Sequence, residues 1–204
     1  MSNYFLFIFA GFISGSIMYS YLIAKIFYDV DIIEQGEDHN PGTTNVMRCV
    51  SVKLGILCMI LDVLKGMVPV LIALRFLDTQ NKLFAIVIAA PVLGHAFSPF
   101  LKFRGGKAIA STFGVFLGLS TLECPIVLLL ALPMAFFSAV MVIKPDSLRV
   151  IISMVTFAAI GMALPMVPPS YALSAVIITA TVVFKHIINF GDEKASFKLF
   201  FIKK

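Results

Sequence analysis

Long apolar runs, separated by short polar stretches, account for most of this sequence of 204 residues. Hydrophobic residues make up 60% of the chain and charged residues 13%, whereas a soluble globular domain carries about 25% charged residues. Runs of roughly 17–25 apolar residues can cross a bilayer, and a backbone without access to water must then be helical. The sequence therefore predicts an all-α integral membrane protein with seven transmembrane helices, in a single domain over residues 1–204. The expected spans are about 4–24, 54–75, 83–101, 108–122, 125–143, 149–166 and 171–189.

The lysine and arginine residues lie mainly on one side of the predicted membrane. With an odd number of spans, the two termini lie on opposite sides. Of the 16 Lys and Arg residues, only Arg75 and Lys82 flank the sparsely charged side, and Lys65 lies inside a span. The positive-inside rule then places the N-terminus outside and the C-terminus in the cytoplasm. The basic cytoplasmic face will attract anionic lipid headgroups and anionic substrates. No groove-reading pattern favours a nucleic-acid partner.

The chain contains three cysteines. Cys49, Cys58 and Cys124 are an odd number and form no Cys-x-x-Cys pair. Disulfide frameworks and zinc sites require paired cysteines at characteristic spacings. We therefore expect all three to be packing residues, and the sequence predicts no metal site.

Arg104, Gly105, Gly106 and Lys107 lie between two predicted spans, at the cytoplasmic surface and directly before a helix. Glycines allow backbone N–H groups to approach a phosphate, and a helix N-terminus favours negative charge. The two cations add fixed positive charge, so this segment can bind an anion. A basic glycine turn between two spans also serves simply to orient a membrane protein, and the motif by itself leaves both interpretations open.

The longest predicted loop covers residues 29–48 on the same cytoplasmic face. An Asn-Pro-Gly turn over residues 40–42 is followed by Thr43, Thr44 and Asn45. These side chains can cap a helix that begins near Val46, and their hydroxyl and amide groups can also bind a ligand. A capped, solvated turn and a ligand-binding loop are both consistent with this pattern.

Asp62 and Lys65 place opposite charges three residues apart inside the second predicted span. At this spacing the two side chains share one face of a helix and can neutralise each other. Ionisable residues within a span are functional candidates. We interpret Asp62 as part of a structural ion pair beneath the cytoplasmic loops, and leave a functional role open for Lys65.

Residues 94–112 read GHAFSPFLKFRGGKAIAST. This segment resembles the second sequence motif of the acyl-phosphate-dependent glycerol-3-phosphate acyltransferases, the bacterial PlsY family of integral membrane enzymes. The Asp-x-x-Lys-Gly pattern over residues 62–66 also resembles that family, as do the chain length and the predicted layout. The resemblance covers essentially the whole chain.

The resemblance implies transfer of a fatty acyl group from acyl phosphate to glycerol 3-phosphate, giving lysophosphatidic acid and inorganic phosphate for phospholipid biosynthesis. It places the enzyme in the bacterial cytoplasmic membrane, with the active site on the cytoplasmic face and neither a metal nor another cofactor. The partners would be these two substrates and membrane lipid. Acyl phosphate carries its own leaving group, so positioning and charge stabilisation can supply most of the catalysis.

Matching the three motifs of the family to this sequence gives a set of expected site residues. The expected catalytic residues are Lys107, Arg48, His186 and Asn189. The expected substrate-binding residues are Asn40, Gly42, Thr44, Asn45, Arg104, Gly105, Gly106, His95 and Lys65. Their cationic, amide and hydroxyl groups are the donors that phosphate-bearing substrates require.

The first motif departs from the family pattern. Glu37, Asp38 and His39 stand where the family has a shorter segment with a serine. A carboxylate ~4 Å from a phosphate would cost about 4 kcal/mol at an effective dielectric near 20. We therefore expect the two carboxylates to point into solvent or to meet a cation: a metal, Lys107, Arg48, or a positive group on an altered acceptor. The hypothesis is that this segment tunes the choice of acceptor, with His39 as a general base. A solvated turn is the alternative.

The third motif also departs from the family. In an alignment without gaps, the family's arginine becomes Asp192 and its glutamate becomes Lys198. Both charges then reverse, which preserves a pair of opposite sign if the two positions touch. A deletion that aligns Gly191 and Glu193 with the family's glycine and glutamate is the alternative, and the sequence leaves both open.

Three other functions compete with the acyltransferase. A diverged paralogue would use acyl phosphate with a different acceptor, which the carboxylates at Glu37 and Asp38 favour. A transporter would need a path across the membrane, for which only Asp62 and Lys65 supply charges within the spans. A non-catalytic membrane protein would have no use for the intact motif around Lys107.

Overall fold

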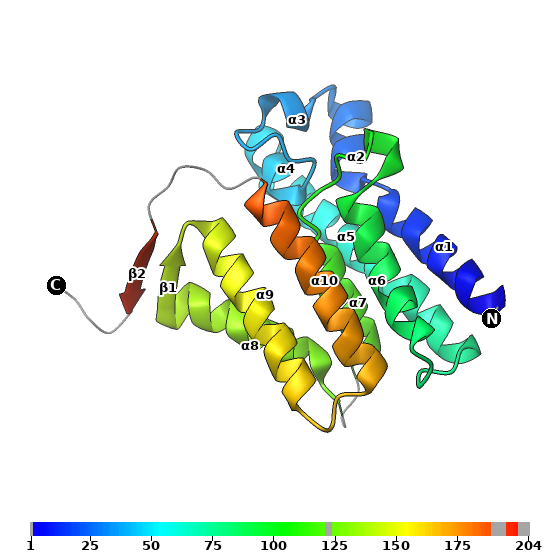
Figure 1. Cartoon of the computed structure of the whole chain (residues 1–204). Coiled ribbons are helices and arrows are strands. Elements are labelled where there is room, and N and C mark those ends of the chain that lie inside the picture. The colour runs from blue at the N-terminus through cyan, green and yellow to red at the C-terminus, as the bar shows by residue number, and fades with distance from the viewer. Residues whose placement is uncertain (1, 121–123, 189–194, 200–204) are drawn as a thin grey trace.

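The computed structural model describes residues 2–120, 124–188 and 195–199. Most of these residues are helical, and α10 lies between α1 on one side and α9 on the other (Figure 1). The helices are α1 (Ser2–Ser16), α2 (Tyr19–Tyr28), α3 (Ile32–Gln35), α4 (Thr43–Cys49), α5 (Val52–Phe76), α6 (Leu83–Ala96), η1 (Pro99–Leu101), α7 (Ile109–Leu119), α8 (Ile126–Ala135), η2 (Phe136–Val140), α9 (Asp146–Ala163) and α10 (Pro169–Ile187).

The helices are shorter and more often interrupted than the sequence predicts. Among the described residues, four helical segments are long and apolar enough to cross a membrane: α5, α6 with η1, α9 and α10. The pair α1 and α2 becomes a fifth if the bent pair counts as one span. The seven expected spans thus correspond to four or five by length and composition. Helix α7 has 11 residues, a rise of about 16 Å, against a hydrocarbon core of about 30 Å.

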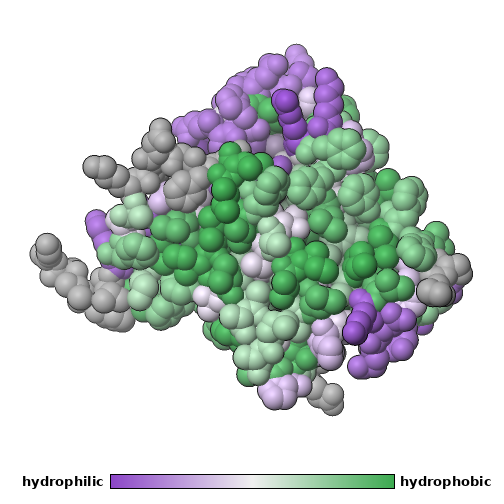
Figure 2. Space-filling view, viewed as in Figure 1, coloured by the Kyte–Doolittle hydropathy of each residue, from purple (hydrophilic) through white to green (hydrophobic). Residues whose placement is uncertain are grey.

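An apolar surface lies between two polar ends of the molecule. Figure 2 shows hydrophobic side chains over the helical body, with hydrophilic side chains gathered at the end that carries α3 and α4 and at the opposite corner. Large hydrophobic side chains are exposed on this surface, among them Phe5, Phe9, Phe76, Leu132 and Met162. A bilayer would cover such side chains, since a soluble protein rarely exposes so large an apolar patch.

Close packing of α5 on α7 depends on two glycines. A Cβ at Gly66 of α5 would clash with the carbonyl of Ser111, and a Cβ at Gly114 of α7 would clash with the carbonyl of Val63. Small residues let the backbones of two helices approach in a membrane, where dispersion contacts rather than water drive association. These glycines therefore fix the distance of α7 from α5.

The first predicted span, 4–24, is a broken helix rather than a continuous one. Helices α1 and α2 are separated at Ile17 and Met18 and bent by 40°. The break frees backbone carbonyls, which need partners away from water. Lys65 Nζ donates to the Ile17 carbonyl at 2.6 Å, and Ser98 Oγ donates to the Ser16 carbonyl at 2.6 Å. Side chains from α5 and from the start of η1 thus stabilise the break.

A short antiparallel sheet is an exception to the all-α prediction. Strand β1 (Met141–Lys144) follows η2, where the sequence predicts the end of the span 125–143, and pairs with β2 (Ser196–Leu199). Val142 lies opposite Lys198 in this register. Helix α8 therefore ends earlier than expected, and the chain after α10 returns to the segment before α9.

Candidate active site

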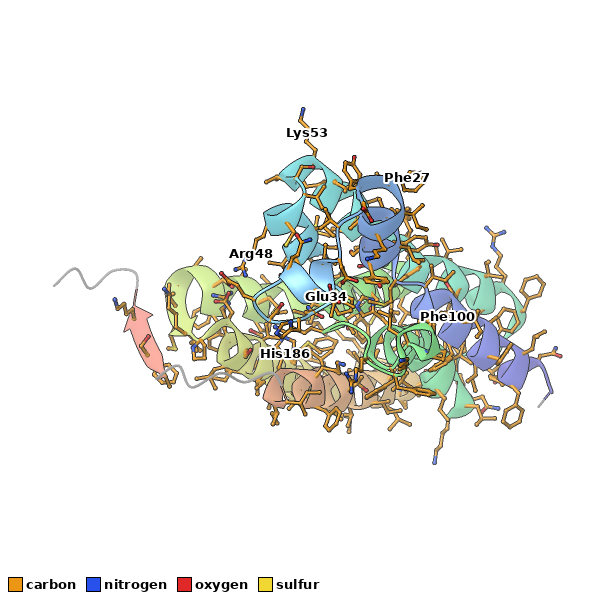
Figure 3. All side chains as sticks on the ribbon, turned by 90° about the horizontal axis from the view of Figure 1, so that it is seen from above. Phe27, Glu34, Arg48, Lys53, Phe100 and His186 are labelled. Carbon is orange, nitrogen blue, oxygen red and sulfur yellow. The ribbon has the colours of Figure 1, made fainter. Side chains whose placement is uncertain are left out.

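The polar segments singled out from the sequence gather at one end of the bundle. In Figure 1 the α3–α4 segment, the η1–α7 connection and the C-terminal end of α10 all lie at the top. Figure 3 shows the molecule from that end. This view places Arg48, Glu34 and His186 over the same part of the fold, whereas Lys53 extends away from it. Residues up to about 150 positions apart in the chain are thus brought to one surface.

Lys107 lies directly before the N-cap residue of α7. Residue Ala108 has a φ of 60°, in the left-handed region, and is the N-cap of the helix. The segment before it has no regular secondary structure and leads from the exposed Arg104 into the buried glycines. The Lys107 side chain is 21% exposed, and its Nζ lies 2.8 Å from Asp38 Oδ2. A cation thus lies at a helix N-terminus, the arrangement from which the sequence predicts anion binding, and its partner in this structure is Asp38.

The two glycines of this segment pack against His95. The Gly106 N–H donates to the His95 carbonyl at 3.1 Å. A Cβ at Gly105 would clash with that carbonyl, and a Cβ at Gly106 would clash with the imidazole ring. Packing against His95 therefore requires both glycines, and the Gly106 N–H, which the sequence predicts to approach a phosphate, is bonded to the protein. His95 is 3% exposed, and within the described ranges its Nδ1 has no hydrogen-bond partner.

A polar cavity of about 90 Å³ joins these elements. Its volume exceeds the share of one water molecule in the liquid, about 30 Å³, so it has room for a small polar group. Backbone at the start of α7, the α4 N-terminus and one buried imidazole contribute to its wall. The lining residues are Asn40, Gly42, Thr43, Thr44, Asp62, His95, Lys107, Ala108, Ile109 and Ala110.

The first loop, over residues 29–42, and the start of α4 supply further residues that line the cavity. Helix α4 begins at Thr43 with Gly42 as its N-cap, three positions before the predicted start near Val46. The threonines and Asn45 therefore lie in the first turn of the helix and do not cap it. Thr43, named from the sequence as a possible donor, lines the cavity, as do Ala108, Ile109 and Ala110. These last three residues were not predicted, because their side chains carry no polar group.

Asp38 is the centre of the hydrogen bonds in this loop. Its Oδ1 accepts from Asn45 Nδ2 at 2.9 Å and from the Asn40 N–H at 3.3 Å, while Oδ2 accepts from Lys107. Asn45 Nδ2 also donates to the Asn40 carbonyl at 2.8 Å. Burial raises the pKa of the Asp38 carboxyl, but the hydrogen bonds from Lys107 and Asn45 and the charge of Lys107 outweigh it. The net pKa lies below the ordinary value of 3.8, so this group is a carboxylate near neutral pH.

The neighbouring residues of the unusual segment lie at the surface. Glu37 pairs with Arg48 at 3.0 Å, with side chains that are 85% and 57% exposed. His39 is exposed and its Nδ1 lies 2.8 Å from the Ile33 carbonyl. Of the expected outcomes for the two carboxylates, contact with a protein cation is the one observed for both: Asp38 meets Lys107 and Glu37 meets Arg48.

Lys65 lies outside the cavity wall. Its ammonium group is 2.8 Å from Asp62 Oδ1, and the two side chains are 1% and 2% exposed. The same ammonium donates to the Ile17 carbonyl at the break of the first span. Asp62, which we interpreted as structural, does line the cavity and accepts a long hydrogen bond of 3.5 Å from Ser20 Oγ. The ion pair therefore connects the cavity to the bend between α1 and α2.

His186 is buried in the last turn of α10. Its Nδ1 lies 2.8 Å from the Val182 carbonyl. Because a carbonyl can only accept, this contact assigns the ring proton to Nδ1 and leaves Nε2 as an acceptor in the neutral ring. Asn189, Asp192 and the residues of the alternative alignment, Gly191 and Glu193, lie outside the described residues. Lys198, which would reverse charge in the alignment without gaps, is exposed in β2.

The fold and the site together describe a helical protein with an apolar surface and, at one end, a polar cavity lined by Lys107, Asp62 and the start of two helices. A family model described as glycerol-3-phosphate acyltransferase matches residues 5–194, and the chain belongs to this family. Two solved structures of PlsY (YgiH), an integral membrane glycerol 3-phosphate acyltransferase, have the same fold. The glycerol 3-phosphate form has a TM-score of 0.78 at 28% identity over 92% of this chain and 90% of that one. The lysophosphatidic acid form has a TM-score of 0.73 at 28% identity, over 92% and 89%.

Curated relatives are also similar in sequence. Glycerol-3-phosphate acyltransferase 1 of Thermotoga maritima is 44% identical over 130 residues, which cover 63% of each chain. The glycerol-3-phosphate acyltransferase of Leptospira borgpetersenii is 43% identical over 123 residues, or 60% of this chain and 56% of the relative. The matched region thus spans less than two thirds of the length of these relatives. With its apolar helices and its family, the protein is a multi-pass membrane protein.

Proposed function

We propose that this protein transfers a fatty acyl group from acyl phosphate to glycerol 3-phosphate, giving lysophosphatidic acid and inorganic phosphate. Membership of the glycerol-3-phosphate acyltransferase family supports the proposal. One geometric observation carries it for this chain: Lys107, the N-terminus of α7 and the donors of the first loop border a single polar cavity. A cation, a helix N-terminus and hydroxyl groups are the features that bind a phosphate.

The chemistry requires positioning rather than a nucleophile from the protein. The sn-1 hydroxyl oxygen attacks the acyl carbonyl carbon, a new ester bond forms, and the bond from that carbon to the phosphate oxygen breaks. The hydroxyl proton leaves with the phosphate. Negative charge develops on the carbonyl oxygen and on the leaving phosphate, where Lys107 and the α7 N-terminus stabilise it.

The remaining site residues take supporting roles in this proposal. Arg48 lies on the exposed side of the loop, where it can bind the second phosphate. His186 presents Nε2 as a hydrogen-bond acceptor, and Asn189 follows it three positions later in the sequence. Lys65 acts indirectly, through the bend of the first span.

We propose that the site faces the cytoplasm at the bacterial cell membrane. The seven apolar segments would form one domain with the N-terminus outside and the C-terminus in the cytoplasm, α7 and α8 completing the layout as short spans. The basic residues support this orientation, since Lys102, Arg104 and Lys107 lie at the end of the site, whereas Arg75 and Lys82 flank the other end. Both substrates carry phosphate and one carries a lipid tail, which suits a site at this surface.

The test is an assay of purified protein with palmitoyl phosphate and glycerol 3-phosphate, in which lysophosphatidic acid and inorganic phosphate are both measured. We expect Lys107→Ala to lose at least about tenfold in turnover, because a charge-assisted contact is worth about 1.5–3 kcal/mol. Lys53→Ala is the matched control, since Lys53 is exposed and extends away from the site (Figure 3). Full activity of Lys107→Ala would contradict the assignment of Lys107 as the residue that stabilises the phosphate.

A second candidate is a diverged enzyme that uses acyl phosphate with another acceptor. The observation in its favour is the carboxylate of Asp38, which lies in the site where the family has a neutral serine region. In a panel of acceptors, the native chain would then acylate a neutral or amine-bearing alcohol in preference to glycerol 3-phosphate. Replacement of Glu37-Asp38-His39 by Ser-Gly would reverse that preference. Equal activity of both proteins on glycerol 3-phosphate would sink this candidate.

A further inference from the structure

The Asp38 carboxylate lies where the site would hold an anion. It accepts hydrogen bonds from the Lys107 ammonium at 2.8 Å, the Asn45 amide at 2.9 Å and the Asn40 N–H at 3.3 Å. The same groups belong to the set that the proposed function assigns to phosphate-bearing substrates. One oxygen faces the cation and the other faces the two neutral donors, as two oxygens of a phosphate would.

The loop conformation directs this carboxylate inward. The next residue, His39, has a φ of 49°, which residues other than glycine rarely adopt, and its ring is held at the Ile33 carbonyl. Gly36, before the segment, packs against Asn45 so closely that a Cβ there would clash with the amide. The backbone on both sides of Asp38 therefore has a defined conformation. It brings the carboxylate to Lys107, which is 69 residues away in the chain.

Two interpretations of this contact make opposite predictions. If the ion pair is only a brace for the loop, its removal would loosen the site and weaken binding of phosphate. If the carboxylate occupies the anion position, its removal would free Lys107 and Asn45 and strengthen binding. The Lys107 and Asp38 side chains are 21% and 36% exposed, so solvent can reach the contact and an incoming anion can replace it.

We propose, as an extension of the proposed function, that Asp38 is a specificity-determining residue that competes with phosphate groups for Lys107 and Asn45. A phosphate carries a charge of about −1.5 to −2, against −1 for the carboxylate, and can displace it. While Asp38 is bonded to Lys107, a substrate phosphate cannot bind there. For a partly exposed ion pair, this competition lowers the apparent affinity of the protein for phosphate-bearing substrates about fivefold. Asp38 thereby raises the KM for phosphate-bearing substrates and weakens inhibition by the phosphate product.

The direct test is titration of the purified protein in detergent with inorganic phosphate, by isothermal titration calorimetry. We expect Asp38→Asn and Asp38→Ser to bind phosphate about fivefold more tightly than the native protein. Asp38→Glu keeps the charge and is expected to bind less tightly than the other two variants. Glu34→Gln is the control, because it removes the same charge from an exposed position nearby. Equal or weaker binding by both neutral variants would overturn the proposal.

Steady-state kinetics supply a second readout. We expect Asp38→Asn to lower the KM for glycerol 3-phosphate and to increase inhibition by inorganic phosphate. A raised KM for glycerol 3-phosphate in Asp38→Asn would identify a brace and refute the competition. If no variant forms lysophosphatidic acid, the proposed function fails, while the phosphate titration still decides the role of Asp38.

Discussion

Removal of the Lys65 ammonium should destabilise the protein more than removal of the whole ion pair. In Lys65→Met, the Asp62 carboxylate keeps its charge in a site where its side chain is 2% exposed, and the Ile17 carbonyl loses its donor. Removal of one partner of a buried pair costs about 3–5 kcal/mol. In Asp62→Leu/Lys65→Met no charge is stranded, and the unsatisfied carbonyl alone costs about 1–3 kcal/mol. The double variant should therefore be more stable than the single one.

Thermal unfolding in detergent, followed with a thiol-reactive dye, can measure this difference. Cys58 is fully buried in the same helix, one turn before Asp62, so in a variant with Cys49→Ser and Cys124→Ser its thiol reports the opening of this region. Lys53→Met is the control on the same helix, and an exposed substitution of this kind changes stability by less than about 0.5 kcal/mol. A single variant as stable as the native protein, or a double variant less stable than the single one, would refute the reasoning.

Two further predictions concern the site. Gly105→Ala should reduce turnover at least tenfold and lower the unfolding midpoint, because the new Cβ would clash with the His95 carbonyl and overpacking costs about 1–3 kcal/mol; an assay and a melt that match the native protein would contradict this. The folded-state pKa of Asp38 is depressed below 3.8, so its stabilisation is complete above that pH and is lost as the pH falls through the depressed value. Melts of the native protein and of Asp38→Asn should therefore differ at pH 7 and converge in acid; a constant difference would exclude an ionised Asp38 as the cause.

The sequence predicts the positions of the apolar helical segments because their signal is local. The predicted segments 54–75, 83–101 and 171–189 differ from the observed helical segments by only a few residues. The break at Ile17 has a less specific signal, since residues 4–24 contain no proline and only Ser14, Gly15 and Ser16 directly before it disfavour a continuous helix. The break depends on two hydrogen-bond donors that are distant in the sequence. Lys65 is 48 positions from Ile17, and Ser98 is 82 positions from Ser16.

In the site, too, features within one contiguous segment could be predicted from the sequence, whereas contacts between distant segments could not. The motif around Lys107 and the turn before α4 are each contiguous in sequence, and Lys107, Asn40, Gly42 and Thr44 line one cavity. The predicted residues Arg104, Gly105, Gly106 and Asn45 are not part of its lining. The partner of Asp38 could not be chosen from the sequence, because solvent, a metal and two different cations all satisfied the electrostatic argument. Only the fold brings Lys107 within 2.8 Å of it. The inward position of Lys65 likewise follows from the bend of α1 and α2 rather than from its spacing to Asp62.

The bend of the first span also bears on how the protein is built. Translation produces the α1–α2 segment first, whereas the donors that satisfy its freed carbonyls come from Lys65 and Ser98. A helix in lipid without those donors favours an unbroken set of backbone hydrogen bonds. The first segment would therefore enter the bilayer as a straight helix and bend only after residue 98 has been made. Insertion of this protein then has an order, in which the loop that carries Asp38 reaches its final position after α5 and η1 have joined the bundle.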